Sequence, residues 1–329
     1  MADGEGESNH FVSMSTDEEE DDRQPEEEVQ EMVQLDPTAV DIDLNHSRIG
    51  RIENLEVLTC VESICFRNNL IKAIENVACV AQTLRELDLY DNQITRIENL
   101  DALVNLEVLD LSFNRIRKIE NLDNLTKLKK LFLVQNKIGK IENISQLTSL
   151  EMLELGANKI RVIENIGSLV KLDSLYIGKN KVTRISGLDT LENLTVLSMQ
   201  SNRIVKMEGM EKLVNLDQLY LSHNGIEDIE GLDKNTKLTT LDLAGNRIKR
   251  LQNISHLVKL EEFWFNDNHL ESWEDLNQLT PLKNLQTVYL ERNPLWRSAE
   301  DPRSPDPNYR RKVMLTLPWL QQIDATFVR

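Results

Sequence analysis

Apolar and polar positions alternate along this chain in a pattern that repeats every 22 residues. In each copy two leucines flank one variable residue, as at 87–89 and 109–111, and an asparagine follows three residues later. Alternation with a period of two predicts a short strand whose leucines face a core. The asparagine recurs in phase at positions 92, 114, 136, 158, 180, 202, 224, 246 and 268. A fixed period held this long predicts one repetitive solenoid.

Further copies end at Asn69 and Asn293, and a degenerate first copy at 42–44 carries Ser47 where the asparagine belongs. About twelve copies are therefore present. Each reads L-x-x-L-x-L-x-x-N-x-I-x-x-I, and in this pattern the chain resembles the leucine-rich repeat class over residues 42–293.

The spacing also predicts how the copies stack. The strands would pair into one curved parallel sheet on the concave face, and each asparagine amide would satisfy backbone groups between neighbouring coils. The later Ile and Leu positions predict 3-10 or short helical turns on the convex face, because about 22 residues leave no room for a long helix. The expected fold class is therefore α/β, a leucine-rich-repeat solenoid of about twelve 22-residue repeats with a C-terminal repeat cap.

Three regions follow from the distribution of charge and repeats. Residues 1–35 hold 13 acidic residues and one basic residue, so they carry −12 of the chain's −17 and leave −5 for the rest. This composition predicts a disordered acidic leader. The solenoid would occupy 36–293, and 294–329 would form the cap with an inserted loop at 296–307. Within the leader, Ser15 and Thr16 each stand three residues before an acid, which makes them candidate phosphorylation sites.

Motifs for catalysis are absent from the sequence. It contains no dinucleotide fingerprint, phosphate-binding loop, nucleophile elbow or H-E-x-x-H zinc motif, and no two of its five histidines have ligand spacing. We therefore expect no enzyme activity, no metal and no cofactor. An enzymatic alternative would depend on Asp88 and Asp110, two carboxylates on adjacent expected strands.

The overall charge and hydropathy limit the class of partner. A charge of −17 argues against nucleic acid and anionic membrane, since both favour basic surfaces. No apolar run approaches the roughly 20 residues needed to span a bilayer.

The residue between the two leucines of each copy is the most informative position, because it faces the concave side and core packing does not dictate it. Five of the twelve residues there are aromatic, although the whole chain has only 16 aromatic residues. Most of the others are acidic. In chain order the twelve are Asp43, Cys65, Asp88, Asp110, Phe132, Glu154, Tyr176, Ser198, Tyr220, Asp242, Trp264 and Tyr289.

Two explanations fit this enrichment. Aromatic side chains favour strands and stack along a sheet, which is a purely structural reason. Alternatively, rigid aromatic anchors between carboxylates form a surface for a protein with apolar pockets and basic residues. Twelve strands about 4.8 Å apart span on the order of 50–60 Å, a length that suits a folded protein.

A closer resemblance comes from the Ile-Glu-Asn-Leu endings at 97–100 and 119–122, the acidic leader and the tail at 324–328. With these features the chain is similar, over roughly 40–329, to the leucine-rich-repeat regulators of protein phosphatase 1. The resemblance implies a non-catalytic subunit that binds the catalytic subunit of this serine/threonine phosphatase on its concave face. It also implies modulation of the phosphatase's biogenesis, activity or substrate choice, including in mitosis and chromosome segregation.

The same resemblance implies a nuclear and cytoplasmic protein that is monomeric when free and can accept a third, inhibitor subunit. The family's contact pattern falls on Asp110, Phe132, Glu154, Tyr176, Asp242, Glu262, Trp264 and Tyr289. Tyr176 stands where the family usually has Phe, and the 296–307 insertion departs from the pattern. Tyr220 joins these residues as a ninth candidate because it belongs to the same column of outward residues.

The short [RK]-V-x-[FW] docking segment of many phosphatase-1 regulators is absent, so docking would depend on the concave face. A scaffold of another complex, such as an axonemal or spliceosomal adaptor, is the alternative.

Overall fold

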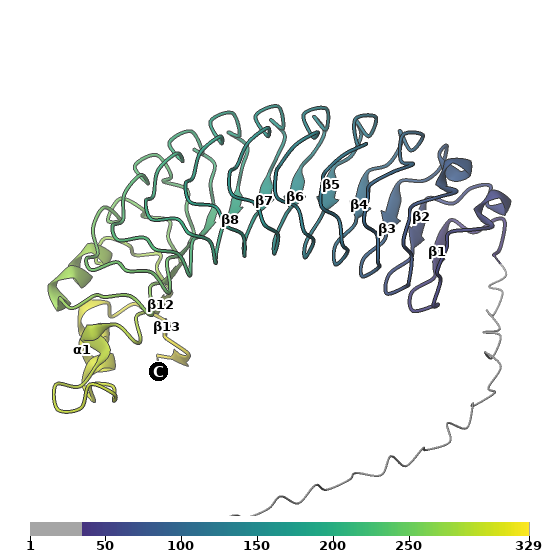
Figure 1. The fold of residues 1–329 in the computed structure, drawn as a ribbon. Helices are drawn as coiled ribbons and strands as arrows, with labels where there is room; N and C mark the ends of the chain where they lie inside the picture. The colour runs from purple at the N-terminus through teal and green to yellow at the C-terminus, as the bar shows by residue number, and fades with distance from the viewer. Residues whose placement is uncertain (1–34, 329) are drawn as a thin grey trace, which may run out of the picture. The chain divides into compact units, whose positions relative to one another are not determined.

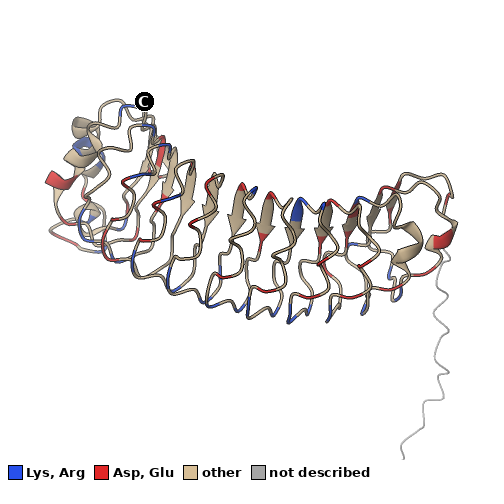
Figure 2. Cartoon of the chain, turned by 90° about the horizontal axis from the view of Figure 1, so that it is seen from above, with Lys and Arg blue, Asp and Glu red and all other residues tan. Residues whose placement is uncertain are grey.

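The computed structural model describes residues 35–328, which wind into a curved solenoid with the strands on the inner side of the arc (Figure 1). Residues 1–34 of the expected acidic leader, with Ser15 and Thr16, lie outside the described residues. Figure 2 shows the strands side by side along the solenoid, with most charged residues outside them.

Each coil contributes one three-residue strand to a parallel sheet, and the strands follow one another in chain order. The twelve are β1 Asp41–Asp43, β2 Ser63–Cys65, β3 Glu86–Asp88, β4 Val108–Asp110, β5 Lys130–Phe132, β6 Met152–Glu154, β7 Ser174–Tyr176, β8 Val196–Ser198, β9 Gln218–Tyr220, β10 Thr240–Asp242, β11 Glu262–Trp264 and β12 Thr287–Tyr289. The predicted solenoid of about twelve repeats with a parallel sheet on the concave face is confirmed.

The middle residue of every strand points into the core, where columns of leucine and isoleucine are fully buried. No single coil could bury these side chains alone, so stacking on neighbours supplies the stability. The turns opposite the strands are tight: the N–H of Leu103 donates to Leu100 O at 2.9 Å, and that of Leu106 to Leu103 O at 3.0 Å. These i to i+3 bonds are of the expected 3-10 type.

Helices are short and few in residues 35–328. The 3-10 helices are η1 Leu55–Val57, η2 Val77–Val80, η3 Trp273–Leu279 and η4 Pro294–Trp296. The only α-helix of this region, α1 Tyr309–Thr316, belongs to the C-terminal cap. The helical part of the predicted α/β class is therefore small.

The recurring asparagines form a ladder of hydrogen bonds through the solenoid. The Asn158 amide donates to Leu133 O at 2.8 Å and to Leu155 O at 3.1 Å, while its Oδ1 accepts from Ile138 N at 3.0 Å. Each ladder asparagine thus joins its own coil to the one before it, as predicted. A buried backbone N–H such as that of Ile138 would otherwise lack a partner.

A second asparagine column accompanies the first, at the Glu-Asn-Leu endings. Asn99 and Asn121 have positive φ angles of 59° and 58°, and their amides donate to Ile74 O and Ile97 O of the preceding coil. Gly209 occupies this column with φ 71°, where an added Cβ would lie 2.5 Å from Ile185 O. The Glu-Asn-Leu endings are visible in the sequence, but their positive φ angles and their hydrogen bonds to the preceding coil are not.

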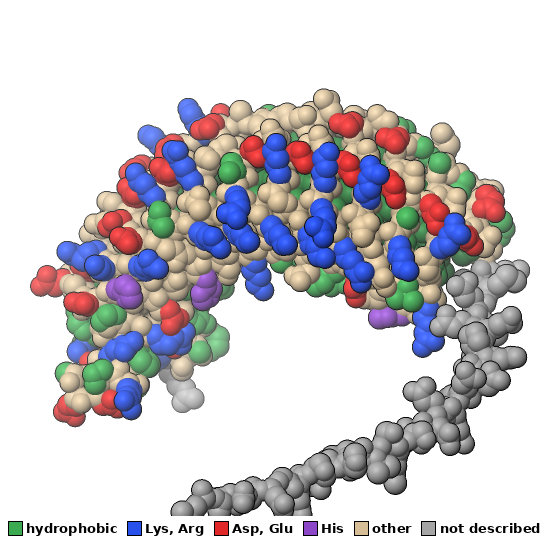
Figure 3. Space-filling view, in the orientation of Figure 1, with side chains coloured by type: hydrophobic (Ala, Val, Ile, Leu, Met, Phe, Trp, Pro, Cys, Tyr) green, Lys and Arg blue, Asp and Glu red, His purple; other side chains and the backbone are tan. Residues whose placement is uncertain are grey.

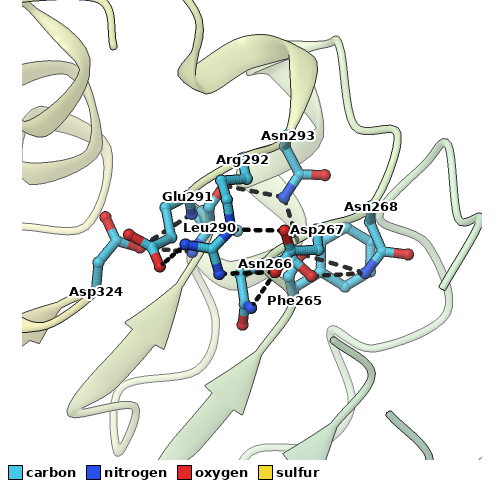
Figure 4. A network of polar contacts seen from close by, with 9 residues as sticks. All are labelled: Phe265, Asn266, Asp267, Asn268, Leu290, Glu291, Arg292, Asn293 and Asp324. Atoms are coloured by element: carbon cyan, nitrogen blue, oxygen red, sulfur yellow. Dashed lines mark hydrogen bonds and ion pairs between the residues drawn. The ribbon is translucent and has the colours of Figure 1, made fainter. Parts of the chain in front are cut away.

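The C-terminal cap continues the ladder with different residues. Strands β13 Gln322–Ile323 and β14 Thr326–Phe327 extend the sheet, and β14 is antiparallel. Asp324 accepts hydrogen bonds from Leu290 N at 2.8 Å and Glu291 N at 3.0 Å, so a carboxylate closes the last coil (Figure 4). In the segment 296–307, Arg297 and Pro305 form a backbone bridge.

Candidate functional site

The residues predicted to bind a partner lie along one line of the concave face. Each third strand residue pairs in register with its neighbour, for example Asp110 with Phe132 and Trp264 with Tyr289. We call this line the concave stripe: Asp110, Phe132, Glu154, Tyr176, Ser198, Tyr220, Asp242, Trp264 and Tyr289. Glu262, at the start of β11, lies in the adjoining line. The structure therefore brings all nine candidates together on one face, and their role in binding stays a prediction.

The aromatic rings at the C-terminal end of the stripe contact one another. Trp264 lies 6.4 Å from Tyr220 and 6.0 Å from Tyr289 between ring centroids, both edge to face. This arrangement is favourable for aromatic quadrupoles, so stacking explains part of the enrichment. The rings nevertheless stay partly exposed. The Trp264 Nε1–H is shielded from solvent and has no hydrogen-bond partner within residues 35–328. A buried donor left unpaired costs free energy that a bound acceptor would recover.

The aspartates have a local structural role that the column pattern did not reveal. Asp88 accepts from Tyr90 N at 3.0 Å, and Asp110 from Ser112 N at 2.8 Å. Such side-chain bonds to the N–H two residues later terminate strands and are typical of aspartate. Part of the acidic enrichment therefore has a reason unrelated to partners.

Asp242 and Ser198 correct the expectation that the whole column faces solvent. Asp242 is only 5% exposed and accepts a hydrogen bond from Ala244 N at 3.0 Å. Burial raises the pKa of this carboxyl, and the Ser222 hydroxyl and Ala244 N–H oppose the rise only in part. Asp242 thus offers a partner little surface, while Ser198, 3% exposed, leaves a gap in the stripe.

The two glutamates are better placed to meet a partner. Glu154 is half-buried in the stripe, and burial followed by the charge of Asp110 raises the pKa of its carboxyl. Glu262 is exposed beside the aromatic cluster. A basic group brought against Glu154 would offset the cost of its desolvation and the repulsion from Asp110 by attraction to the carboxylate.

Basic residues gather away from the stripe, and Figure 3 shows Lys and Arg in rows along the flank that faces the viewer. In the sequence, a basic residue directly follows six of the ladder asparagines: Arg115, Lys137, Lys159, Lys181, Arg203 and Arg247. In another row, Arg96 and Arg184 pair with Glu120 and Glu208 of the next coil. The net charge of the whole chain does not reveal these rows of basic residues. The argument from net charge against anionic partners therefore does not apply to this flank.

The enzymatic alternative gains no support from the geometry of Asp88 and Asp110. The two are register partners, but Asp88 forms an ion pair with Arg67 at 3.3 Å, and both cap backbone N–H groups. Within residues 35–328, no three His, Cys, Asp or Glu side chains are grouped so that they could hold a metal ion. No helix in this part of the chain is long and apolar enough to cross a membrane.

Comparisons with known proteins agree with the geometry. A family model described as a leucine-rich repeat region matches residues 83–301. The chain is 61% identical over 70 residues to protein phosphatase 1 regulatory subunit 7 of Homo sapiens, which covers 20% of this chain and 19% of that protein. It is 53% identical over 57 residues to the Xenopus tropicalis protein of the same name, covering 17% and 16%. The matches thus span about a fifth of the length of these curated relatives.

Among solved structures, the fold is similar to that of an internalin from Listeria monocytogenes. The TM-score is 0.68 at 24% sequence identity, over 88% of this chain and 87% of the internalin. This likeness concerns the fold alone.

Proposed function

Because the chain belongs to the leucine-rich repeat family, whose stacked coils present a concave sheet to partners, we propose that it is a non-catalytic regulatory subunit of protein phosphatase 1. The catalytic subunit of the phosphatase would bind on the concave stripe. The names of the curated relatives support this partner, although the matches cover only a fifth of their length.

One observation carries the proposal: the partly exposed cluster of Tyr220, Trp264 and Tyr289 contains an indole N–H without a hydrogen-bond partner in the described residues. Rings held edge to face are rigid, so little conformational entropy is lost when a partner covers them. Tyr and Trp are also the side chains that most often dominate protein interfaces. Glu154 and Glu262 flank the rings with carboxylates that favour basic partner residues.

The proposal is tested by measuring the dissociation constant of the phosphatase catalytic subunit by calorimetry. Trp264→Ala should weaken binding about 30-fold or more, the effect of losing a central interface residue. Val205→Ala is the control, because Val205 is 61% exposed and lies outside the strands that form the sheet. Both variants should keep the wild-type melting temperature within a few degrees. Unchanged affinity of a folded Trp264→Ala variant would contradict the proposal.

We extend the proposal to the cellular roles that the resemblance implies. These are modulation of phosphatase biogenesis, activity or substrate choice, including in mitosis and chromosome segregation, in both nucleus and cytoplasm. The free protein would be a monomer, and the complex would accept a third, inhibitor subunit. Light scattering tests the free state, and affinity purification with mass spectrometry tests the partners. Recovery of axonemal or spliceosomal proteins, lost with Trp264→Ala, would favour the alternative of a scaffold in another complex.

A further inference from the structure

The gap in the concave stripe at Ser198 forms a hollow in the sheet surface. The adjacent strands β7 and β9 carry rings at the same register, Tyr176 and Tyr220, while the Ser198 side chain is small and buried. The hollow measures about 230 Å³. Its lining consists of Tyr176, Val196, Ser198, Gln200, Gln218 and Tyr220.

The polar groups of the hollow are uncharged. The Ser198 hydroxyl donates to Gln200 Oε1, and the Tyr220 hydroxyl donates to Gln218 Oε1 at 3.0 Å. These bonds hold both glutamines in place and leave acceptor lone pairs on the hydroxyl and amide oxygens. The hollow therefore offers two aromatic walls and a floor with hydrogen-bond acceptors on the hydroxyl and amide oxygens and donors on the two amide nitrogens.

The charges around the hollow within the stripe are negative. Glu154 precedes Tyr176 by one strand, and Asp242 follows Tyr220 by one strand. Glu262 lies close enough to contribute to the raised pKa of Tyr220, after burial. Lys179 follows β7 but is exposed and does not line the hollow. The surroundings thus favour a cationic occupant over an anionic one.

The spacing of the walls suits a planar cation. The backbones of β7 and β9 lie two strand spacings apart, roughly 10 Å, so Tyr176 and Tyr220 flank the Ser198 position on both sides. A cation acts on an aromatic face within about 6 Å of the ring centroid, and a guanidinium also stacks flat on rings. Its several N–H donors match the oxygens of the floor, which an ammonium on a flexible stem would satisfy less completely.

We propose that this hollow receives an arginine side chain of the protein bound on the concave stripe. The inference rests on the proposed function and adds a specificity site to it. The guanidinium lies between Tyr176 and Tyr220, above Ser198, and its charge faces Glu154 on the side of the N-terminal strands.

Charge-matched variants at Ser198 test the sign of the occupant. Ser198→Asp and Ser198→Asn differ by one charge and are nearly equal in size, and the same column already carries Asp at 110 and 242, so both variants should fold. We expect the catalytic subunit of protein phosphatase 1 to bind Ser198→Asp about tenfold more tightly than Ser198→Asn. Equal affinities, or weaker binding by Ser198→Asp, would overturn the proposal.

Variants of the wall test the ring. Tyr220→Phe and Tyr220→Leu both lose the hydroxyl that holds Gln218, but only Phe keeps an aromatic face, so Tyr220→Leu should bind about tenfold more weakly than Tyr220→Phe. Equal binding by the two would show that the occupant is apolar and overturn the proposal.

Trp264→Ala separates the two proposals. If it weakens binding while the Asp and Asn variants of Ser198 bind alike, the arginine site is wrong and concave docking stands. If neither Trp264→Ala nor any variant of the hollow changes affinity in folded protein, concave docking fails and the arginine site fails with it.

Discussion

The side-chain amide of Asn235 donates a 2.9 Å hydrogen bond to the backbone carbonyl of Leu213, which lies at the equivalent position one coil earlier. Leucine occupies this position in neighbouring coils, for example at 213 and 257, and Asn235 is as completely buried as those leucines. Its Oδ1 atom has no hydrogen-bond partner within residues 35–328.

Asn235→Leu should therefore stabilise the protein. The substitution removes an unsatisfied buried acceptor, which costs about 1–3 kcal/mol. The Asn235 amide also donates to Met210 O at 3.1 Å, and both carbonyls that lose the amide keep backbone donors, Leu213 N and Leu216 N. Urea unfolding should show a higher midpoint. A midpoint equal to or below the wild-type value would mean that the side chain is satisfied in solution, for example by a buried water.

Asn158→Ala should destabilise the solenoid by about 3 kcal/mol, because it removes several hydrogen bonds and leaves the buried N–H of Ile138 unpaired. Asn193→Ala is the matched control. Its amide makes one exposed bond, to Val170 O at 2.9 Å, so its loss should change the free energy of unfolding by less than about 0.5 kcal/mol. Equal effects of the two substitutions in urea unfolding would contradict the structural role of the ladder.

As pH rises, the free energy of unfolding of Asp242→Asn should increase relative to that of the wild-type protein. Burial raises the folded-state pKa of Asp242, so the folded protein holds this proton more strongly than the unfolded chain. The favourable contribution is complete below the unfolded pKa and is lost as pH rises through the folded one. Asparagine keeps an acceptor for Ala244 N without titrating.

The measurement is the difference in unfolding free energy between wild type and Asp242→Asn from pH 4 to 7. A difference that stays constant, or moves in favour of wild type, would show that the carboxylate is not penalised by burial. Other titrating groups are common to both proteins and cancel.

Asp324→Ala should release the C-terminal cap. Asp324 has φ 51° and accepts hydrogen bonds from Leu290 N, Glu291 N and, at 3.3 Å, the hydroxyl of Tyr309. Its loss should cost about 2–4 kcal/mol locally and accelerate amide hydrogen exchange at Leu290 and Glu291. Asp324→Asn keeps an acceptor and tolerates the same backbone conformation, so its exchange rates should stay near those of wild type. Equal acceleration in both variants would assign the effect to charge.

Most of the fold follows from the sequence because a 22-residue period leaves one stacking arrangement. The strands, the sheet and the ladder at positions such as Asn158 are all consequences of that period. Periodicity could not show which of the repeated polar residues form hydrogen bonds within the protein and which remain available to a partner. Asp110 belongs to the column of candidate contacts, yet its carboxylate also caps Ser112 N.

The sequence predicted which residues belong to the candidate site, but not how exposed each of them is or what shape their surface has. Its residues follow from alternation, whereas the burial of Asp242 and the hollow at Ser198 depend on side-chain packing between coils. The second asparagine column was visible as a repeated Glu-Asn-Leu ending. Its role required the positive φ of residues such as Asn99, which no apolar pattern reveals.

The ladder has a mechanical consequence. In the part of the chain that the structure describes, each ladder asparagine joins adjacent coils, and each strand pairs only with its neighbours in chain order. Because each coil contacts mainly its neighbours, small rotations between successive coils accumulate along the solenoid. Together they can produce a large change in its curvature. A rigid partner bound between Asp110 and Tyr289 could therefore increase the curvature of the solenoid at a small free-energy cost per coil. The measured binding free energy would include the sum of these costs.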